Sequence, residues 1–326
     1  MARVVVTQDR GAPRARLGWG RPALPLAGAL LLVVFPFLGA GTFTTTLLTE
    51  ALIYAIWAMS LDLLVGFTGL VTFGHAAGFG LATYAAGWFA REVAPELPLV
   101  FVVSQSVVAA VALVTGFVAT RVSGVAFAII SLAICQVLFQ IAVGWRAVTE
   151  GMDGLVGVPL PRLFGRTIVP GVEFYLLTVT LLIAVYVGLR WLVDTPFGRT
   201  LQAIRTNEQR AAAIGINVRL HKWLAFVISW FVAGLAGTLF VFMKAGTTPM
   251  VLHWSESGNV LAMTIFGGLG TLIGPIVGAI GFVFLRDEFT THFRAWQFAF
   301  GLVFVLVVIL FPSGLAGLAS RFWSRP

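Results

Sequence analysis

Residues 173–193 read EFYLLTVTLLIAVYVGLRWLV, an apolar run with one acidic and one basic side chain. A run of about 20 apolar residues is long enough to cross the hydrocarbon core of a bilayer as a helix. Two glycine-rich blocks, 68–90 and 258–285, are also long enough and predict packed or broken helices. The sequence therefore predicts about eight to ten membrane helices, because further apolar runs lie at 24–41, 46–66, 98–120, 124–144, 223–243 and 296–311.

The composition of the whole chain agrees with this pattern. Of its 326 residues, 59% are hydrophobic and 10% are charged, and the mean hydropathy is +0.98. A soluble domain carries roughly a quarter of charged residues, so a soluble enzyme with an anchor is excluded. The apolar runs are continuous rather than alternating, which excludes a β-barrel. The expected fold class is an all-α polytopic membrane protein, whose backbone polar groups bond to one another within helices.

The positions of arginine and lysine predict the orientation. The net charge of +8 needs no nucleic acid as a partner, because positive residues gather on the cytoplasmic side of membrane proteins. Residues 1–23 carry five arginines, and the segment 190–222 carries six positive residues. Both are expected in the cytoplasm. The first apolar run is too long for a signal peptide and is followed by no small-residue cleavage pattern, so residues 1–23 are interpreted as a basic cytoplasmic tail.

The remaining boundaries follow from the same rule. Residues 24–318 are expected to form the membrane domain, and residues 319–326 a short C-terminal tail with two arginines. A cytoplasmic C-terminus requires that the block 258–285 contain a re-entrant piece or two passes. The sequence leaves both arrangements open, and the number of spans with them.

The segment 194–216, DTPFGRTLQAIRTNEQRAAAIGI, is unusually polar for this chain. Thr195 followed by Pro196 is typical of a helix start, and Gly215 offers a stop. Apolar residues recur on one face at Phe197, Leu201, Ile204 and Ala211. The pattern predicts one short amphipathic helix. Two interpretations stay open, a helix lying on the membrane surface and a helix that docks in a groove of a soluble partner.

The two glycine-rich blocks suggest an internal pseudo-repeat. The first contains GFTGLVTFGHAAG (66–78) and the second GGLGTLIGPIVG (267–278). Interrupted segments at corresponding positions of two halves point to a transport path, whereas small residues also allow simple close packing. Ionisable residues at membrane depth usually face a bundle interior or a cavity. The candidate path residues are Asp62, Gly69, Thr72, Gly74, His75, Gly267, Gly268, Gly270 and Gly274.

For Asp62 and His75 a polar contact between helices is the favoured interpretation, ahead of contact with substrate. An intramembrane enzyme that uses this pair is disfavoured, because no nucleophile motif accompanies them. The single cysteine, Cys135, lies in an apolar run and is expected to be an inert buried thiol. The four histidines are scattered, so no metal site and no cofactor are expected.

Five stretches, in a fixed order, make the chain resemble a known family. The first is SLDLLVGFTGLVTFGHAAGFGLATYAAG at 60–87. The others are 124–133 with 149–159, 195–239, 260–279 and 310–318. Together they resemble the LivH/LivM permease subunits of ABC importers for branched-chain amino acids, and the LivM branch most. Two departures stand out: Asp62 replaces a frequent Asn, and Glu150 replaces a glycine in a Thr-Gly-Gly element.

The resemblance implies a multi-pass permease of the bacterial inner membrane that carries branched-chain or other hydrophobic amino acids. Its implied partners are two ATPase subunits, a second and non-identical permease, an external substrate-binding protein and membrane lipid. ATP hydrolysis is expected in the partner, and the sequence lacks a P-loop motif. The alternatives are a permease for urea or short amides, and a secondary transporter or channel that needs no ATP.

The resemblance also gives the loop 194–222 a role in coupling to the ATPase. The positions that fall on the family's loop pattern are Gly198, Ala203, Arg205, Glu208, Ala212 and Gly215. Gly215 is expected to reverse the chain. Arg205 and Glu208 are expected to make polar contacts at the ATPase surface.

Overall fold

The computed structural model describes residues 23–38 and 41–292, together with positions 298, 301 and 314. The longer helices are α1 (Ala23–Val34), α2 (Thr42–Asp62), α3 (His75–Glu92), α4 (Leu97–Ala119), α5 (Val125–Gly144), α7 (Val172–Asp194), α8 (Pro196–Thr206), α10 (Val218–Lys244), α11 (Trp254–Gly267) and α12 (Ile273–His292). The short helices are α6 (Arg146–Thr149), α9 (Glu208–Ala213), the 3-10 turns η1 (Phe35–Leu38), η3 (Gly151–Asp153) and η4 (Pro249–Leu252), and the π-helical turn η2 (Leu63–Thr68).

Five of these elements are long and apolar enough to cross a membrane: α2 with η2, α4, α5, α7 and α10. They confirm the all-α membrane fold and the apolar runs predicted from residue 46 to residue 243. The run at 24–41 corresponds to α1 and η1, which form a shorter helix. The run predicted at 296–311 lies outside the described residues.

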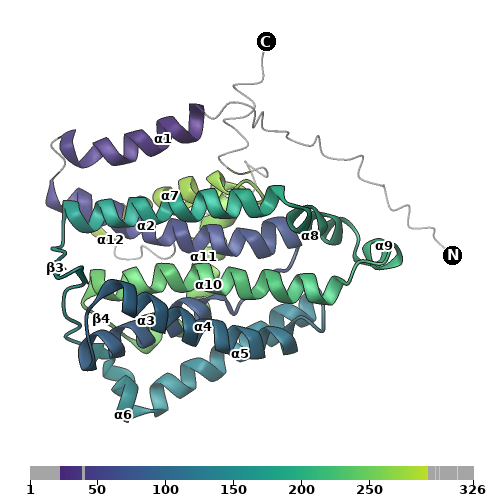
Figure 1. Ribbon diagram of the computed structural model, residues 1–326, viewed down its shortest axis with the longest axis horizontal. Helices are drawn as coiled ribbons and strands as arrows, with labels where there is room; N and C mark the ends of the chain where they lie inside the picture. The colour runs from purple at the N-terminus through teal and green to yellow at the C-terminus, as the bar shows by residue number, and fades with distance from the viewer. Residues whose placement is uncertain (1–22, 39–40, 293–297, 299–300, 302–313, 315–326) are drawn as a thin grey trace.

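The long helices lie side by side, with α8 and α9 at one end of the bundle and the short strands at the other (Figure 1). We call these the α8–α9 end and the strand end. Helix α2 is the core of the bundle, and its apolar window is completely buried. It packs against α7, α10, α11 and α12. Helices α3, α4 and α5 lie beyond α10, on the other side of the bundle from α1 (Figure 1).

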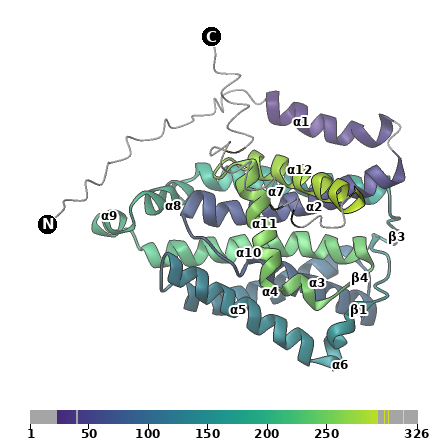
Figure 2. The same cartoon turned by 180° about the vertical axis from the view of Figure 1, so that it is seen from behind.

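Both glycine-rich blocks are interrupted, as predicted. In the first, α2 continues as a π-helical turn to Thr68, and α3 starts only at His75. In the second, α11 ends at Gly267 and α12 starts at Ile273. Helix α11 has 14 residues, which gives a length of about 21 Å, short of the roughly 30 Å hydrocarbon core. Figure 2 shows α11 running across its neighbours at a steep angle.

Two pairs of short strands at the strand end were not predicted. Strand β1 (Leu155–Val156) pairs with β4 (Gly246–Thr247), and β2 (Arg162–Leu163) pairs with β3 (Arg166–Thr167), both antiparallel. The first pair fastens the loop after α6 to the chain that leads from α10 into α11. Two-residue strands leave almost no alternating pattern in a sequence, which is why they escaped prediction.

Candidate functional site

The polar segment 194–216 forms two helices rather than the single predicted helix. Its start is as expected, because Pro196 is the first residue of α8 and the Thr195 hydroxyl accepts the amide N–H of Gly198. The predicted single helix is interrupted at Asn207, whose backbone is extended (φ −163°, ψ 107°). The Asn207 side chain accepts the amide N–H of Arg210 at 2.9 Å and so caps α9. By accepting an amide N–H group at the start of α9, the Asn207 side chain favours a new helix start over continuation of α8.

The α8–α9 pair has a buried face and an exposed face. The predicted apolar residues Leu201, Ile204 and Ala211 are buried, and Phe197 is partly buried. Gly198 lies so close to the Val193 backbone at the end of α7 that a β-carbon would collide with it. On the other face, the small side chains of Ala203 and Ala212 are exposed. The exposed side chains at these two positions are therefore small.

Gly215 ends the pair as predicted. It has a φ of +87°, in the left-handed region that favours glycine. Its amide N–H bonds to the carbonyl of Ala212 at 3.0 Å, and that of Ile216 bonds to Ala211 at 3.2 Å. The chain reverses here and enters α10. Open space surrounds Gly215, so backbone conformation rather than packing requires the glycine.

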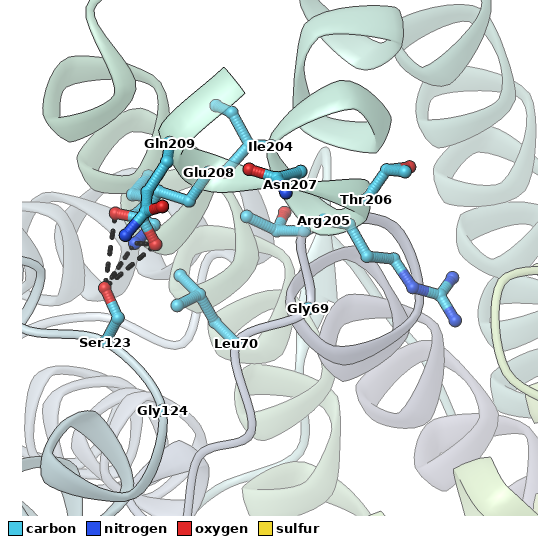
Figure 3. A pocket seen from close by; sticks show the side chains of 12 residues that line it. Gly69, Leu70, Ser123, Gly124, Ile204, Arg205, Thr206, Asn207, Glu208 and Gln209 are labelled. Carbon is cyan, nitrogen blue, oxygen red and sulfur yellow. Dashed lines mark hydrogen bonds and ion pairs between the residues drawn. The ribbon is translucent and has the colours of Figure 1, made fainter. Parts of the chain in front are cut away.

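A cavity of about 360 Å³ lies between α8–α9 and two turns of the membrane bundle (Figure 3). On one side of it, Lys222 of α10 forms an ion pair with Glu208 at 2.6 Å. The Lys222 ammonium also donates to the Ser123 hydroxyl at 2.7 Å, which in turn donates to Glu208 at 3.0 Å. Since Ser123 lies in the turn between α4 and α5, these bonds fasten α9 to α10 and to that turn.

Arg205 points the other way, away from the Ser123–Glu208 pair (Figure 3). Its guanidinium donates to the carbonyl of Gly66, in the π-helical turn that extends α2. Its aliphatic part lies over Gly69, which has a φ of +79°. A β-carbon added at Gly69 would lie 3.0 Å from Arg205 Cγ. Within the described chain, Arg205 and Glu208 are thus engaged with this protein's own membrane turns.

Asp62 holds the break between α11 and α12. Its carboxylate is completely buried. One oxygen accepts the amide N–H of Gly270 at 2.7 Å, and the other accepts that of Leu272 at 3.2 Å. Gly270 and Leu272 both have positive φ, +74° and +57°, a conformation that costs energy for a leucine. The charged hydrogen bonds to Asp62 offset that cost.

Asp62 and Arg205 meet around Gly66. A β-carbon on Gly66 would collide with the Asp62 carboxylate and lie 2.5 Å from the amide nitrogen of Gly270. A β-carbon on Gly270 would lie 3.2 Å from the Arg205 guanidinium. Helix α8 therefore contacts the end of α2, and the end of α2 contacts the α11–α12 break. The glycine motifs 66–78 and 267–278 meet here.

His75 lies in a polar contact between helices. Its Nε2 is 2.7 Å from the Ser60 hydroxyl on α2, and the Ser229 hydroxyl on α10 donates to the Ser60 carbonyl. His75 is completely buried, and its Nδ1 has no hydrogen-bond partner among the described residues. The geometry is that of the helix-to-helix contact favoured from the sequence.

The other candidate path residues lie in close backbone packing. The Thr72 hydroxyl accepts the amide N–H of Gly74 at 3.0 Å, and a β-carbon on Gly74 would collide with the Ser131 carbonyl of α5. A β-carbon on Gly267 would collide with the Gly274 carbonyl. Gly268 has a φ of +116°. Of the nine candidates, Gly69 alone contributes to the lining of the 360 Å³ cavity.

A charged cluster near the strand end was missed from the sequence. Glu50 of α2, 8% exposed, binds Lys244 at 2.8 Å and Arg286 at 2.7 Å. These residues lie on α2, α10 and α12, so the cluster holds three helices together. The clue in the sequence was an acidic residue within the apolar run 46–66.

Comparison with known proteins identifies the family. A family model described as "Branched-chain amino acid transport system / permease component" matches residues 43–311. The permease LivM of the high-affinity branched-chain amino acid transport system of Escherichia coli (strain K12) is 26% identical over 309 residues, covering 88% of this chain and 72% of LivM. The ribose import permease RbsC of Haemophilus influenzae is 24% identical over 213 residues, covering 61% of this chain and 63% of RbsC.

A probable LivH permease of Methanocaldococcus jannaschii is 28% identical over 151 residues, covering 43% of this chain and 45% of LivH. No solved structure matches the chain. The family model extends over well more than half of the sequence and includes every long apolar helix from α2 onward. The chain therefore belongs to the family of permease components of branched-chain amino acid transport systems.

Proposed function

We propose that this chain is the membrane subunit of an ATP-driven importer and that it carries branched-chain or other hydrophobic amino acids across the inner membrane. The observation that carries the proposal is the α8–α9 pair, a short amphipathic element at one end of a buried helical bundle. Its partners are two separate ATPase subunits, a second permease and an external binding protein. ATP hydrolysis takes place in the ATPase subunits.

We place the docking surface on the exposed face of the α8–α9 pair. Small side chains such as Ala203 and Ala212 allow close approach of a partner's groove. Arg205 and Glu208, expected from the sequence to contact the ATPase, are bonded within this chain to Gly66 and Lys222. We therefore assign these two residues to transmitting the movement of α8 and α9 into the membrane helices.

This docking surface is tested by adding bulk to it. In the complex, Ala203→Trp or Ala212→Trp is expected to reduce the ATPase that co-purifies with the permease at least about tenfold, because a large side chain holds the two surfaces apart. Both positions are exposed, so the variants should fold. Val169→Trp, at an exposed position near the strand end, is the control and should retain the ATPase. If the ATPase co-purifies normally with both tryptophan variants, the docking assignment is disproved.

The contacts around Gly66 suggest how movement of α8 reaches the membrane. A shift of α8 displaces the Arg205 guanidinium, which is bonded to the Gly66 carbonyl. Gly66 is one turn beyond Asp62, which holds the amide N–H groups of Gly270 and Leu272. Packed elements transmit small shifts because they do not deform continuously. Displacement of α8 would thereby reach α11 and α12.

Arg205→Gln tests this step. The shorter neutral side chain cannot maintain a charged hydrogen bond to Gly66, so uptake is expected to fall about tenfold while ATPase binding is retained. Arg162→Gln removes an exposed arginine at the strand end, away from α8 and α9, and should leave uptake unchanged. The measurements are ATP hydrolysis and amino-acid uptake by the complex in proteoliposomes. Equal uptake by the two variants would contradict the proposed transmission.

The substrate is tested separately with a panel of radiolabelled leucine, isoleucine, valine, urea and short amides. The proposal predicts ATP-dependent uptake of the three amino acids and none of urea. Uptake that continues without ATP, from a chain that binds no ATPase, would support a secondary transporter and overturn the importer. Uptake of urea or amides alone would retain the importer and change its substrate.

A further inference from the structure

Two arginines lie against one aromatic ring where α4 meets α10, at the α8–α9 end of the bundle. Arg121 follows the end of α4 by two residues, and its guanidinium carbon lies 4.6 Å from the centre of the Phe117 ring. Arg219, in the first turn of α10, places its guanidinium carbon 4.9 Å from the same centre. Two positive charges therefore share one ring. We call Arg121, Arg219 and Phe117 the arginine-pair site.

No carboxylate of the described residues balances this pair. All three residues of the site are exposed, and neither arginine belongs to an ion pair of the described chain. Other basic residues at the same end differ, because Arg190 pairs with Asp194 at 3.2 Å and Lys222 pairs with Glu208 at 2.6 Å. The arginine-pair site is thus a place of unbalanced positive charge on the protein surface.

The start of α10 adds to this positive charge. The N-terminus of a helix carries a partial positive charge, which acidic residues in the first turn stabilise. The first turn of α10 has no acidic residue and contains Arg219. A cation–π contact stabilises an arginine on a ring, but it leaves the repulsion between the two guanidiniums and the helix N-terminus in place. An anion bound to both arginines removes that repulsion.

Apolar surface adjoins the site along both helices. It consists of the exposed side chains of Leu113, Val114 and Val118 on α4 and of Leu220 and Leu224 on α10. Trp223 lies at the same level of the bundle, because its ring meets that of Phe117 edge-on at 6.3 Å and its Nε1 donates to the Leu113 carbonyl at 2.9 Å. Tryptophan is enriched at the boundary between hydrocarbon and lipid headgroups. The two guanidiniums therefore lie at headgroup level, beside apolar surface that suits acyl chains.

We propose that Arg121 and Arg219 bind the phosphate of an anionic phospholipid, whose acyl chains lie against the apolar surface of α4 and α10. Guanidinium groups bind phosphate through paired hydrogen bonds. The positive charge of the α8–α9 end places it in the cytoplasm, where the facing leaflet contains anionic lipid and basic pockets between membrane helices bind acidic headgroups. A zwitterionic headgroup brings a cation of its own, so it balances the two arginines less well.

The position of the site gives the bound lipid a structural consequence. Arg121 is two residues before Ser123, and Arg219 is three residues before Lys222. Ser123 and Lys222 are the two residues that hold Glu208 of α9. A phosphate that binds both arginines would join the α4–α5 turn to the start of α10, and so stabilise the two elements to which α9 is fastened.

The test uses the whole permease assembly, purified in mild detergent, with phosphatidylglycerol as the probe. Native mass spectrometry measures the lipid that remains bound, and the thermal midpoint is followed as lipid is added. Arg121→Gln and Arg219→Gln are each expected to weaken phosphatidylglycerol binding at least about fivefold and to reduce the rise in midpoint, because each removes one of two guanidiniums. Both residues are exposed, so the variants should fold.

Arg190→Gln is the matched control. It removes an arginine from the same end of the bundle, but one whose charge Asp194 balances. This variant should bind phosphatidylglycerol as the unmodified protein does. An equal loss of lipid from Arg190→Gln would show general attraction by positive charge and would overturn the site.

Two further probes separate the possible sources of the phosphate. Phosphatidylcholine tests the need for a negative headgroup, and glycerol phosphate, which has no acyl chains, tests the need for a lipid. Both are expected to raise the midpoint less than phosphatidylglycerol does. Equal effects of phosphatidylcholine would refute an anionic lipid, and equal effects of glycerol phosphate would indicate a site for a soluble anion. Loss of a second permease subunit from either arginine variant would show that the arginines bind that subunit instead.

Discussion

Gly267→Ala is expected to destabilise the membrane domain strongly. Gly267 is the last residue of α11, and a β-carbon there would overlap the carbonyl of Gly274 at the start of α12. Backbone cannot move aside as a flexible side chain does, so the two helices must separate. Overpacking of this kind costs roughly 1–3 kcal/mol or more. That is a large part of the stability of a typical protein.

The measurement is the thermal stability of the detergent-solubilised permease, followed by the loss of its monodisperse peak in size-exclusion chromatography. Gly267→Ala should lower the midpoint by several degrees and reduce the folded yield. Gly188→Ala is the matched control, because Gly188 lies within α7 and a β-carbon there meets no atom within 4 Å. Alanine also favours a helix more than glycine does. Equal midpoints for the two variants would refute the close packing of α11 on α12.

The second large effect is expected at Asp62. Asp62→Ala leaves the amide N–H groups of Gly270 and Leu272 without their buried acceptors. Each lost charged hydrogen bond is worth about 1.5–3 kcal/mol. The α11–α12 break then loses the hydrogen bonds that stabilise its left-handed backbone at Gly270 and Leu272. We expect leucine uptake to fall by more than about tenfold while the ATPase remains bound.

Asp62→Asn should give an intermediate result. The two amide N–H groups bind different carboxylate oxygens, whereas asparagine has one carbonyl oxygen and an NH₂ group. One bond is retained and the other is lost, so uptake should lie between those of the alanine variant and the unmodified protein. Asp153→Asn makes the same change at an exposed carboxylate outside this region and should have no effect. An Asp62→Ala variant with normal uptake would contradict the anchoring role.

The membrane fold was predictable because a run of about 20 apolar residues has few alternatives to a spanning helix. The amphipathic segment 194–216 was predictable for a similar reason, since its apolar residues recur at helical spacing. Its division at Asn207 was not, because the same side chain can lie within a helix or cap the next one. The choice depends on the neighbouring contacts of α9 with Lys222 and Ser123.

The candidate site was predictable in its parts but not in its connections. Glycine and charge patterns indicated Asp62 and the block from Gly267, and the family resemblance indicated Arg205. Contacts over long sequence separation leave no local pattern, so the meeting of Arg205 with Gly66, and of Asp62 with Gly270, required the structure.

The complete burial of α2 also constrains how the protein is made. Helix α2 enters the bilayer early in synthesis, whereas α7, α10 and α12, which surround it, follow more than a hundred residues later. Until they arrive, Glu50 lacks Lys244 and Arg286, and Asp62 lacks the amide groups of the α11–α12 break. The nascent chain therefore holds two acidic residues at membrane depth before their partners exist. Until those helices are inserted, the two carboxyl groups must be protonated or kept away from lipid by the insertion machinery.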